Sequence, residues 1–131
     1  DISYFRGAYK SGAPFVEGRM LNGAPQGQWK IWHENGNIWQ EAYFTDGDKN
    51  GPWQVHYDNG SPWLEGVYRR NLRVGTWRYF WPNGTLMCEG EYEDDARTGR
   101  WRFWGDLGEL LYDGYDLDQF PALDTVNFPS F

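Results

Sequence analysis

Apolar and polar residues alternate along most of this chain, in short runs separated by glycine and asparagine. Such alternation is typical of β-strands with one buried face. The runs recur at a fixed interval, because Gly27, Gly51, Gly75 and Gly99 are 24 residues apart and each precedes a tryptophan by two residues. A fixed period indicates a repeat architecture. We therefore expect an all-β fold of tandem antiparallel β-hairpins that form one elongated, twisted sheet.

Each unit has a turn signal nine residues after its first glycine, at Asn35-Gly36, Asn59-Gly60, Asn83-Gly84 and Leu107-Gly108. Asn-Gly between apolar runs predicts a two-residue type I′ turn, because both central residues of that turn have positive φ. Leucine is strained at positive φ, so a different turn is expected at Leu107. A second tight turn is expected between hairpins, because residues that tolerate a left-handed backbone share one repeat position: Gly47, Asn71 and Asp95.

The turn assignment determines which residues face each other across a hairpin. With Asn35 and Gly36 as the turn, Trp29 faces Ala42 and Lys30 faces Glu41. In later units a tryptophan faces Gly66, Gly90 or Gly114, which leaves room for the indole. The residues beside it pair as Gln54 with Glu65, Arg78 with Glu89 and Arg102 with Asp113. Opposite charges that face each other across strands support this register.

One continuous module without a linker accounts for the chain. Residues 1–115 contain five 24-residue hairpin repeats: a degenerate repeat at 3–26, then 27–50, 51–74, 75–98 and 99–115. In the degenerate repeat Ser11-Gly12 takes the turn, Phe5 faces Gly18 and Arg6 faces Glu17. Residues 116–131 depart from the repeat, and their phenylalanines suggest a cap over the last hairpin.

The alternation separates two faces of different chemistry. One face carries Trp29, Ile31, His33, Ile38, Gln40 and their equivalents; it is nearly free of charge and is expected to form the core. The other carries the charged pairs and a row of large side chains: Trp32, Trp39, His56, Trp63, Phe80, Met87, Trp104 and Leu111. A large apolar row with a charged rim is typical of protein interfaces, so these eight are the candidate partner-binding residues. Packing of Trp32 on Trp39, which only stabilises the sheet, is the alternative.

Histidines and carboxylates do not indicate catalysis. His33 shares a repeat position with Tyr57, Trp81 and Gly105, and His56 shares one with Trp32, Phe80 and Trp104. Each histidine is therefore interpreted as a planar structural residue, and the two are expected on opposite faces, which excludes a shared metal site. Glu41, Glu65, Glu89 and Asp113 form a column in which each residue already has a facing partner. No catalytic residue, metal or cofactor is expected.

Composition narrows the range of partners. The net charge is -7 and the pI is about 4.7, which argues against a nucleic-acid phosphate backbone and suits a basic protein partner. An acidic surface kept only for solubility is the alternative. Cys88 is the only cysteine, so an internal disulfide is excluded. No apolar run suits a transmembrane helix. The compartment stays open, with the cytoplasm favoured over export after removal of a leader.

The repeat unit reads GQWKIWHENGNIWQE at 27–41 and GTWRYFWPNGTLMCE at 75–89. It resembles the MORN-repeat variant of bacterial YwqK-type proteins, over residues 27–115 and more loosely over 3–26. The unit departs from the eukaryotic MORN consensus, so the phosphoinositide binding known for some members of that family is not carried over to this chain. YwqK-type proteins are described as antitoxins or immunity proteins, so the resemblance implies a module that binds a toxin and blocks it.

Two other functions remain open. The segment GTWRYFWPNGTLM at 75–87 also resembles choline-binding repeats, whose aromatic side chains form a cage around a quaternary ammonium. The period here is longer than in that family, and an acid replaces its terminal tryptophan. The first of these functions is recognition of choline or cell-wall carbohydrate. The other is that of a structural scaffold, exported or membrane-associated, that self-associates through a sheet edge or the aromatic row.

Overall fold

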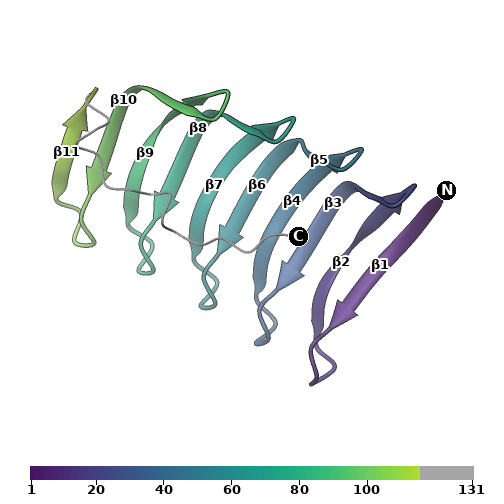
Figure 1. Ribbon diagram of the computed structural model, residues 1–131. Helices are drawn as coiled ribbons and strands as arrows, with labels where there is room; N and C mark the ends of the chain where they lie inside the picture. Colours follow the sequence, from purple (N-terminus) through teal and green to yellow (C-terminus); the bar gives the residue numbers. More distant parts are fainter. Residues whose placement is uncertain (116–131) are drawn as a thin grey trace.

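A computed structural model of the protein describes residues 1–115, which form a single open sheet of 11 antiparallel strands (Figure 1). The strands are β1 (Ile2–Ala8), β2 (Pro14–Leu21), β3 (Ala24–Trp32), β4 (Ile38–Thr45), β5 (Asp48–Lys49), β6 (Gly51–His56), β7 (Pro62–Arg69), β8 (Leu72–Phe80), β9 (Leu86–Glu93), β10 (Ala96–Trp104) and β11 (Leu110–Gly114). The described part contains no helix that could span a membrane. The prediction of an all-β sheet of tandem hairpins is confirmed, whereas the expected cap at 116–131 lies outside the described residues.

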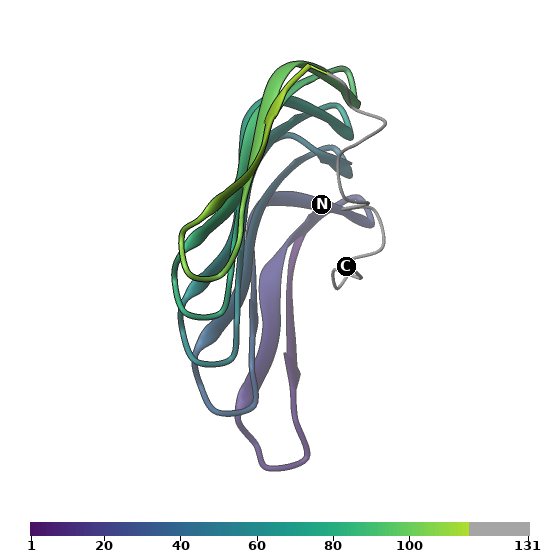
Figure 2. The same cartoon turned by 90° about the vertical axis from the view of Figure 1, so that its left-hand side faces the viewer.

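Strands adjacent in sequence are adjacent in the sheet, and only the short β5 lies off the main path, where it pairs with β4. The hairpin loops lie along one rim, the loop rim, and the turns that connect successive hairpins lie along the opposite rim, the connection rim (Figure 1). Seen along the stack, each hairpin is rotated slightly relative to the one before (Figure 2). This rotation is the right-handed strand twist accumulating over the repeats.

The predicted register is confirmed in every hairpin. Trp29 faces Ala42 and Lys30 faces Glu41, and the equivalent pairs recur through Trp101 with Gly114 and Arg102 with Asp113. In the first hairpin Phe5 faces Gly18 and Arg6 faces Glu17. Size and charge complementarity therefore determined the pairing even in the repeat that departs most from the pattern.

The hairpin loops differ from the predicted turn. His33 N donates to Asn37 O at 2.8 Å, and Gly36 N donates to His33 O at 3.0 Å. Gly36 has a φ of 94°, but Asn35 is not at positive φ. This geometry fits a type I turn followed by a left-handed glycine that forms a bulge. The type I′ prediction is wrong here, and the bulge shifts the pairing so that Trp32 faces Ile38 rather than Trp39.

The expectation of a different turn in the last hairpin is also wrong. Gly105 N donates to Glu109 O at 2.9 Å and Gly108 N donates to Gly105 O at 3.0 Å, as in the other loops. Leu107 is not at positive φ. Because only the glycine of this turn is left-handed, leucine occupies the preceding position without strain.

The type I′ turns lie on the connection rim instead. Two consecutive residues have positive φ at each connection: Asn22-Gly23, Asp46-Gly47, Arg70-Asn71 and Asp94-Asp95. The predicted second tight turn is therefore confirmed, and its type is now assigned. Three of the four glycines that mark the period, Gly27, Gly75 and Gly99, have φ of 74°, 70° and 68°. They lie where the register shifts between hairpins, a bulge that requires a left-handed residue.

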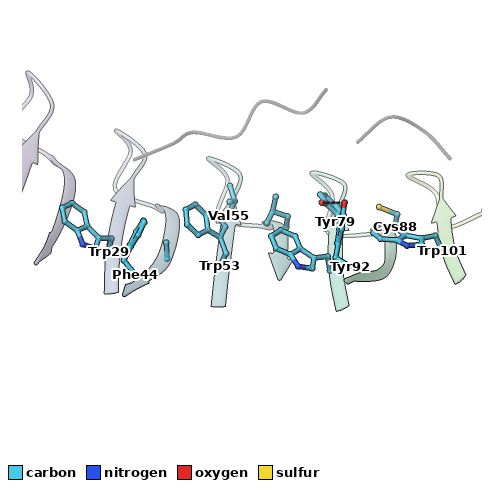
Figure 3. Close-up of a cluster of buried hydrophobic side chains, with 11 residues drawn as sticks. Trp29, Phe44, Trp53, Val55, Tyr79, Cys88, Tyr92 and Trp101 are labelled. Carbon is cyan, nitrogen blue, oxygen red and sulfur yellow. Dashed lines mark hydrogen bonds between the residues drawn. The ribbon is translucent and has the colours of Figure 1, made fainter. Parts of the chain in front are cut away.

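The core is one face of this single sheet, which we call the packed face; Figure 3 shows its buried side chains running across the hairpins. Edge-to-face aromatic contacts link Trp53 to Tyr68 at 5.2 Å, Tyr68 to Trp77 at 5.1 Å, and Tyr92 to Trp101 at 5.2 Å between ring centroids. The clustered residues are Trp29, Ala42, Phe44, Trp53, Val55, Leu64, Trp77, Tyr79, Cys88, Tyr92 and Trp101. The face predicted to be the core is confirmed.

Three indoles, those of Trp29, Trp77 and Trp101, each cover a glycine of the preceding hairpin. A methyl group added at Gly66 would overlap the ring of Trp77, and one added at Gly90 would overlap Trp101. Trp77 Nε1 also donates to the carbonyls of Val67 and Val74, at 3.2 Å each. The spaces predicted at Gly66 and Gly90 therefore hold the indole of the next repeat, and this contact joins one hairpin to the next.

Candidate protein-binding surface

The opposite face, which we call the charged face, carries one row of facing residues across the whole sheet. In order from β1 to β11 these are Arg6, Glu17, Lys30, Glu41, Gln54, Glu65, Arg78, Glu89, Arg102 and Asp113. Charge alternates along this row except at Gln54. Arg78, for example, lies 3.1 Å from Glu89 and 3.8 Å from Glu65. The acidic column predicted from the sequence is thus one half of a continuous, mutually compensating row.

Four of the predicted partner-binding residues stand in a column beside this row. Trp32, His56, Phe80 and Trp104 each end a strand, two residues after a member of the charged row, so strand alternation places them on the charged face. We call them the aromatic column. All four are half-buried. His56 Nδ1 is out of contact with solvent and has no hydrogen-bond partner within residues 1–115.

The other four predicted residues are placed differently. Trp39, Trp63 and Met87 pack against the core cluster. The rings of Trp39 and Trp63 stack on His33 and Tyr57, each with centroids 4.8 Å apart. Trp39 therefore does not stack on Trp32 as the alternative interpretation expected. Leu111, on β11, is 60% exposed.

A ladder of hydrogen bonds from aromatic side chains holds the main chain of the aromatic column. Tyr9 Oη donates to Trp32 O at 2.7 Å, and Tyr57 Oη donates to Phe80 O at 2.6 Å. Trp81 Nε1 donates to Trp104 O at 3.0 Å, and His33 Nε2 lies 2.9 Å from His56 O, an acceptor, so this nitrogen carries the proton. Burial raises the pKa of Tyr57 to about 12, so its hydroxyl remains a donor. Each donor thereby fixes the backbone of a column residue 23 positions later.

Asparagines form a second ladder along the loop rim. Asn35 Nδ2 donates to Asp58 O at 2.7 Å, Asn59 Nδ2 to Pro82 O at 3.2 Å, and Asn83 Nδ2 to Asp106 O at 2.8 Å. Their Oδ1 atoms accept from the amide two residues later, as in Asn59 with Ser61 at 2.8 Å. Neither ladder was predicted from the sequence, although planar donors and asparagines recur there at 24-residue intervals.

Cations of the chain itself lie over aromatic rings of the packed face. Lys49 Nζ is 4.9 Å from the centroid of Trp53 and 5.0 Å from that of Tyr68, and burial lowers the pKa of Lys49. The Arg73 guanidinium is 4.3 Å from the ring of Tyr92. An ammonium between two rings is the arrangement of a choline cage, but here a side chain provides the ammonium.

Reactive groups are scarce in the described part. Residues 1–115 contain no group of three or more His, Cys, Asp or Glu that could hold a metal ion. Cys88 is buried in the packed face, and burial raises the pKa of its thiol. A thiol that stays protonated is a poor nucleophile, so Cys88 acts in this structure as a small buried side chain.

A family model described as MORN repeat variant matches residues 25–46 and 73–94. Each match spans one hairpin, β3 to β4 and β8 to β9, in the same phase of the repeat. No curated protein matches the chain. The chain is thus similar to this repeat family in two of its hairpins, and repeats of this family are in general non-enzymatic binding modules.

Proposed function

We propose that this chain is a non-catalytic protein-binding module whose contact surface is centred on the aromatic column. The observation that carries the proposal is the position of Trp32, His56, Phe80 and Trp104 on the face opposite the core. Large side chains spaced one repeat apart, roughly 10 Å, are not needed there to close the packed face. Half-buried aromatic residues with a charged border are enriched at protein interfaces.

The chemistry of the surface favours a basic partner. Glu41 and Glu65 both flank Gln54, so the middle of the charged row lacks a cation where the other repeats have one. His56 lies two residues from Gln54, on the same face of β6. A basic side chain of a partner would restore the alternation beside an aromatic anchor. The net charge of -7 adds long-range attraction toward such a partner.

The specific form of the proposal is an antitoxin or immunity protein that binds a basic toxin and blocks it. The resemblance to YwqK-type proteins supports this form, and the acidic surface is consistent with it. The ladders support it too, because a surface whose backbone is fixed before binding loses little conformational entropy when a partner docks.

Co-expression with the products of neighbouring genes tests the proposal. We expect one product to inhibit growth, and co-expression of this chain to restore it. The purified pair should bind, and Phe80→Ala combined with Trp104→Ala should weaken binding at least tenfold. Tyr43→Ala is the matched control, since Tyr43 is an exposed aromatic residue of β4 that lies outside the column.

Two outcomes would overturn parts of the proposal separately. If no neighbouring product is toxic or bound, the antitoxin form is wrong. If a partner binds the folded double variant as tightly as it binds the unaltered chain, the aromatic column is not the contact surface. Melting temperatures of all variants separate loss of contact from loss of folding.

A further inference from the structure

Successive hairpins dock through the same three rows at three of the four junctions. Between β4 and β6, Gln40, Ala42 and Gln54 replace the apolar residue, the glycine and the cation. Between β9 and β10, Glu89 faces Arg102, Cys88 faces Phe103, and the indole of Trp101 covers Gly90. Between β2 and β3, Glu17 faces Lys30 and Val16 faces Ile31, while Trp29 covers Gly18. At such a junction an acid on one strand thus faces a cation on the next, and an apolar residue faces an apolar residue. The glycine beside the acid lies under an aromatic ring of the next strand.

The last strand presents the receiving half of this junction. In β11, Asp113, Tyr112 and Gly114 occupy the positions that Glu89, Cys88 and Gly90 occupy in β9. Among the described residues β11 pairs with β10 alone. Among residues 1–115 no indole covers Gly114, and the atom nearest to a methyl group added there is the Tyr112 hydroxyl, at 3.0 Å. Within the described residues β11 is therefore a receptor strand without the aromatic ring that covers the equivalent glycine of β9.

The first strand presents the inserting half. Phe5, Arg6 and Gly7 of β1 occupy the positions of Trp101, Arg102 and Phe103, and β1 pairs with β2 alone in the described part. Phe5 is 50% exposed and Ile2 is 70% exposed. The Arg6 side chain is 74% exposed and only approaches Glu17, at 4.0 Å. An aromatic residue followed by a cation is the sequence that the receptor strand requires.

The sequence that follows β11 supplies no cation for this receptor strand. Residues 116–131 contain no Lys, Arg or His, so they have no cation to place opposite Asp113. They also lack the glycine and tryptophan that begin each repeat at 27, 51, 75 and 99. A second copy of this chain carries both the aromatic ring and the cation, at adjacent positions of a strand that pairs on one edge only within residues 1–115.

We propose that β1 of a second copy adds antiparallel to β11, with Arg6 opposite Asp113 and Phe5 over Gly114. The two surfaces are different, so the contact is head-to-tail and repeats from copy to copy as a linear assembly. The ladders of the loop rim do not cross this junction, because Gly105 and Leu107 occupy the ladder positions of the last hairpin and have no side-chain donor. The association is therefore weaker than the internal junctions, and it depends on concentration.

Light scattering and sedimentation velocity of the intact chain over a range of concentrations test this proposal. The weight-average mass should rise with concentration beyond that of a dimer. Arg6→Glu should keep the chain monomeric, because the introduced acid faces Asp113. Gly114→Leu should do the same by filling the receptor. Lys10→Glu is the matched control, since it makes the same change of charge in the exposed loop after β1 and should assemble like the unaltered chain.

A mixture of two variants gives the sharpest result. Asp113→Arg alone should be monomeric, but in equal amounts with Arg6→Glu both junctions between the two variants pair a cation with an acid, so the mixture should again form assemblies that grow with concentration. A chain that is monomeric at all concentrations, or Gly114→Leu that assembles normally, would overturn the proposal. Assembly only after deletion of residues 116–131 would also overturn it, because that segment would then be the occupant. Circular dichroism establishes that each variant is folded.

Discussion

The two faces of this sheet use the same strands for different purposes. On the packed face, the indoles that cover Gly18, Gly66 and Gly90 are at most 5% exposed. On the charged face, ion pairs such as that of Arg78 with Glu89 are open to solvent. Buried aromatic contacts contribute several times the free energy of exposed ion pairs. Stability therefore resides on one face, which leaves the other free to vary with its partner.

Truncation of a buried indole should have the largest effect. Trp77→Ala removes a side chain that is 2% exposed, and we expect a loss of about 3–5 kcal/mol in the free energy of unfolding. Trp104→Ala on the charged face is the comparison, and it should cost clearly less because Trp104 is half-buried. Urea denaturation of both variants measures the difference. Equal losses would mean that the faces do not differ in their contribution to stability.

Adding one methyl group under an indole should be the next most damaging change. Gly90→Ala places a methyl group within the ring of Trp101, and we expect it to cost about 1–3 kcal/mol. Gly114→Ala is the matched control at the same repeat position, where no indole covers the glycine, and it should be nearly neutral. Thermal melts followed by circular dichroism report both. A neutral Gly90→Ala would show that the indole moves aside at no cost.

Removal of one ladder hydroxyl should cost about 1 kcal/mol. Tyr57→Phe deletes the bond to Phe80 O but keeps the ring that stacks on Trp63. Burial raises the pKa of Tyr57 from 10.0 to about 12, so its neutral form stabilises the fold below pH 10 and this contribution is lost as the pH rises through about 12. Melting temperatures across that range should fall less steeply for Tyr57→Phe. Identical pH profiles would contradict this role.

The smallest effect should come from the charged row. A double-mutant cycle with Arg78→Ala and Glu89→Ala should give a coupling energy below about 1 kcal/mol that shrinks in high salt. The two side chains are in contact, with Arg78 Nε 3.1 Å from Glu89 Oε2, but both are accessible to solvent. A coupling as large as the loss in Trp77→Ala would reverse the comparison between the two faces.

Size and charge complementarity were sufficient to predict the register and the core face from the sequence. The turn type could not be predicted, because Asn-Gly suits both a type I′ turn and a type I turn with a glycine bulge. The presence of asparagine at position 59 is explained by its hydrogen bond to Pro82 O in the next loop, a contact that exists only once the hairpins are stacked.

The same bulge explains why only some of the predicted partner-binding residues lie on the charged face. It displaces Trp39 and Trp63 by one position, and a one-residue shift sends a strand side chain to a different environment. Trp32 and Phe80 precede the bulge, so strand alternation was enough to place them on the charged face.

Both ladders of the loop rim are aimed at main-chain carbonyls, which every residue type provides. A hairpin therefore recognises its successor without regard to the side chains of that successor. A duplicated 24-residue segment would bring its own donors and find acceptors in any neighbour. Tandem duplication or deletion can thus lengthen or shorten such a protein by whole repeats. Selection can then alter the side chains on the charged face of each new repeat independently.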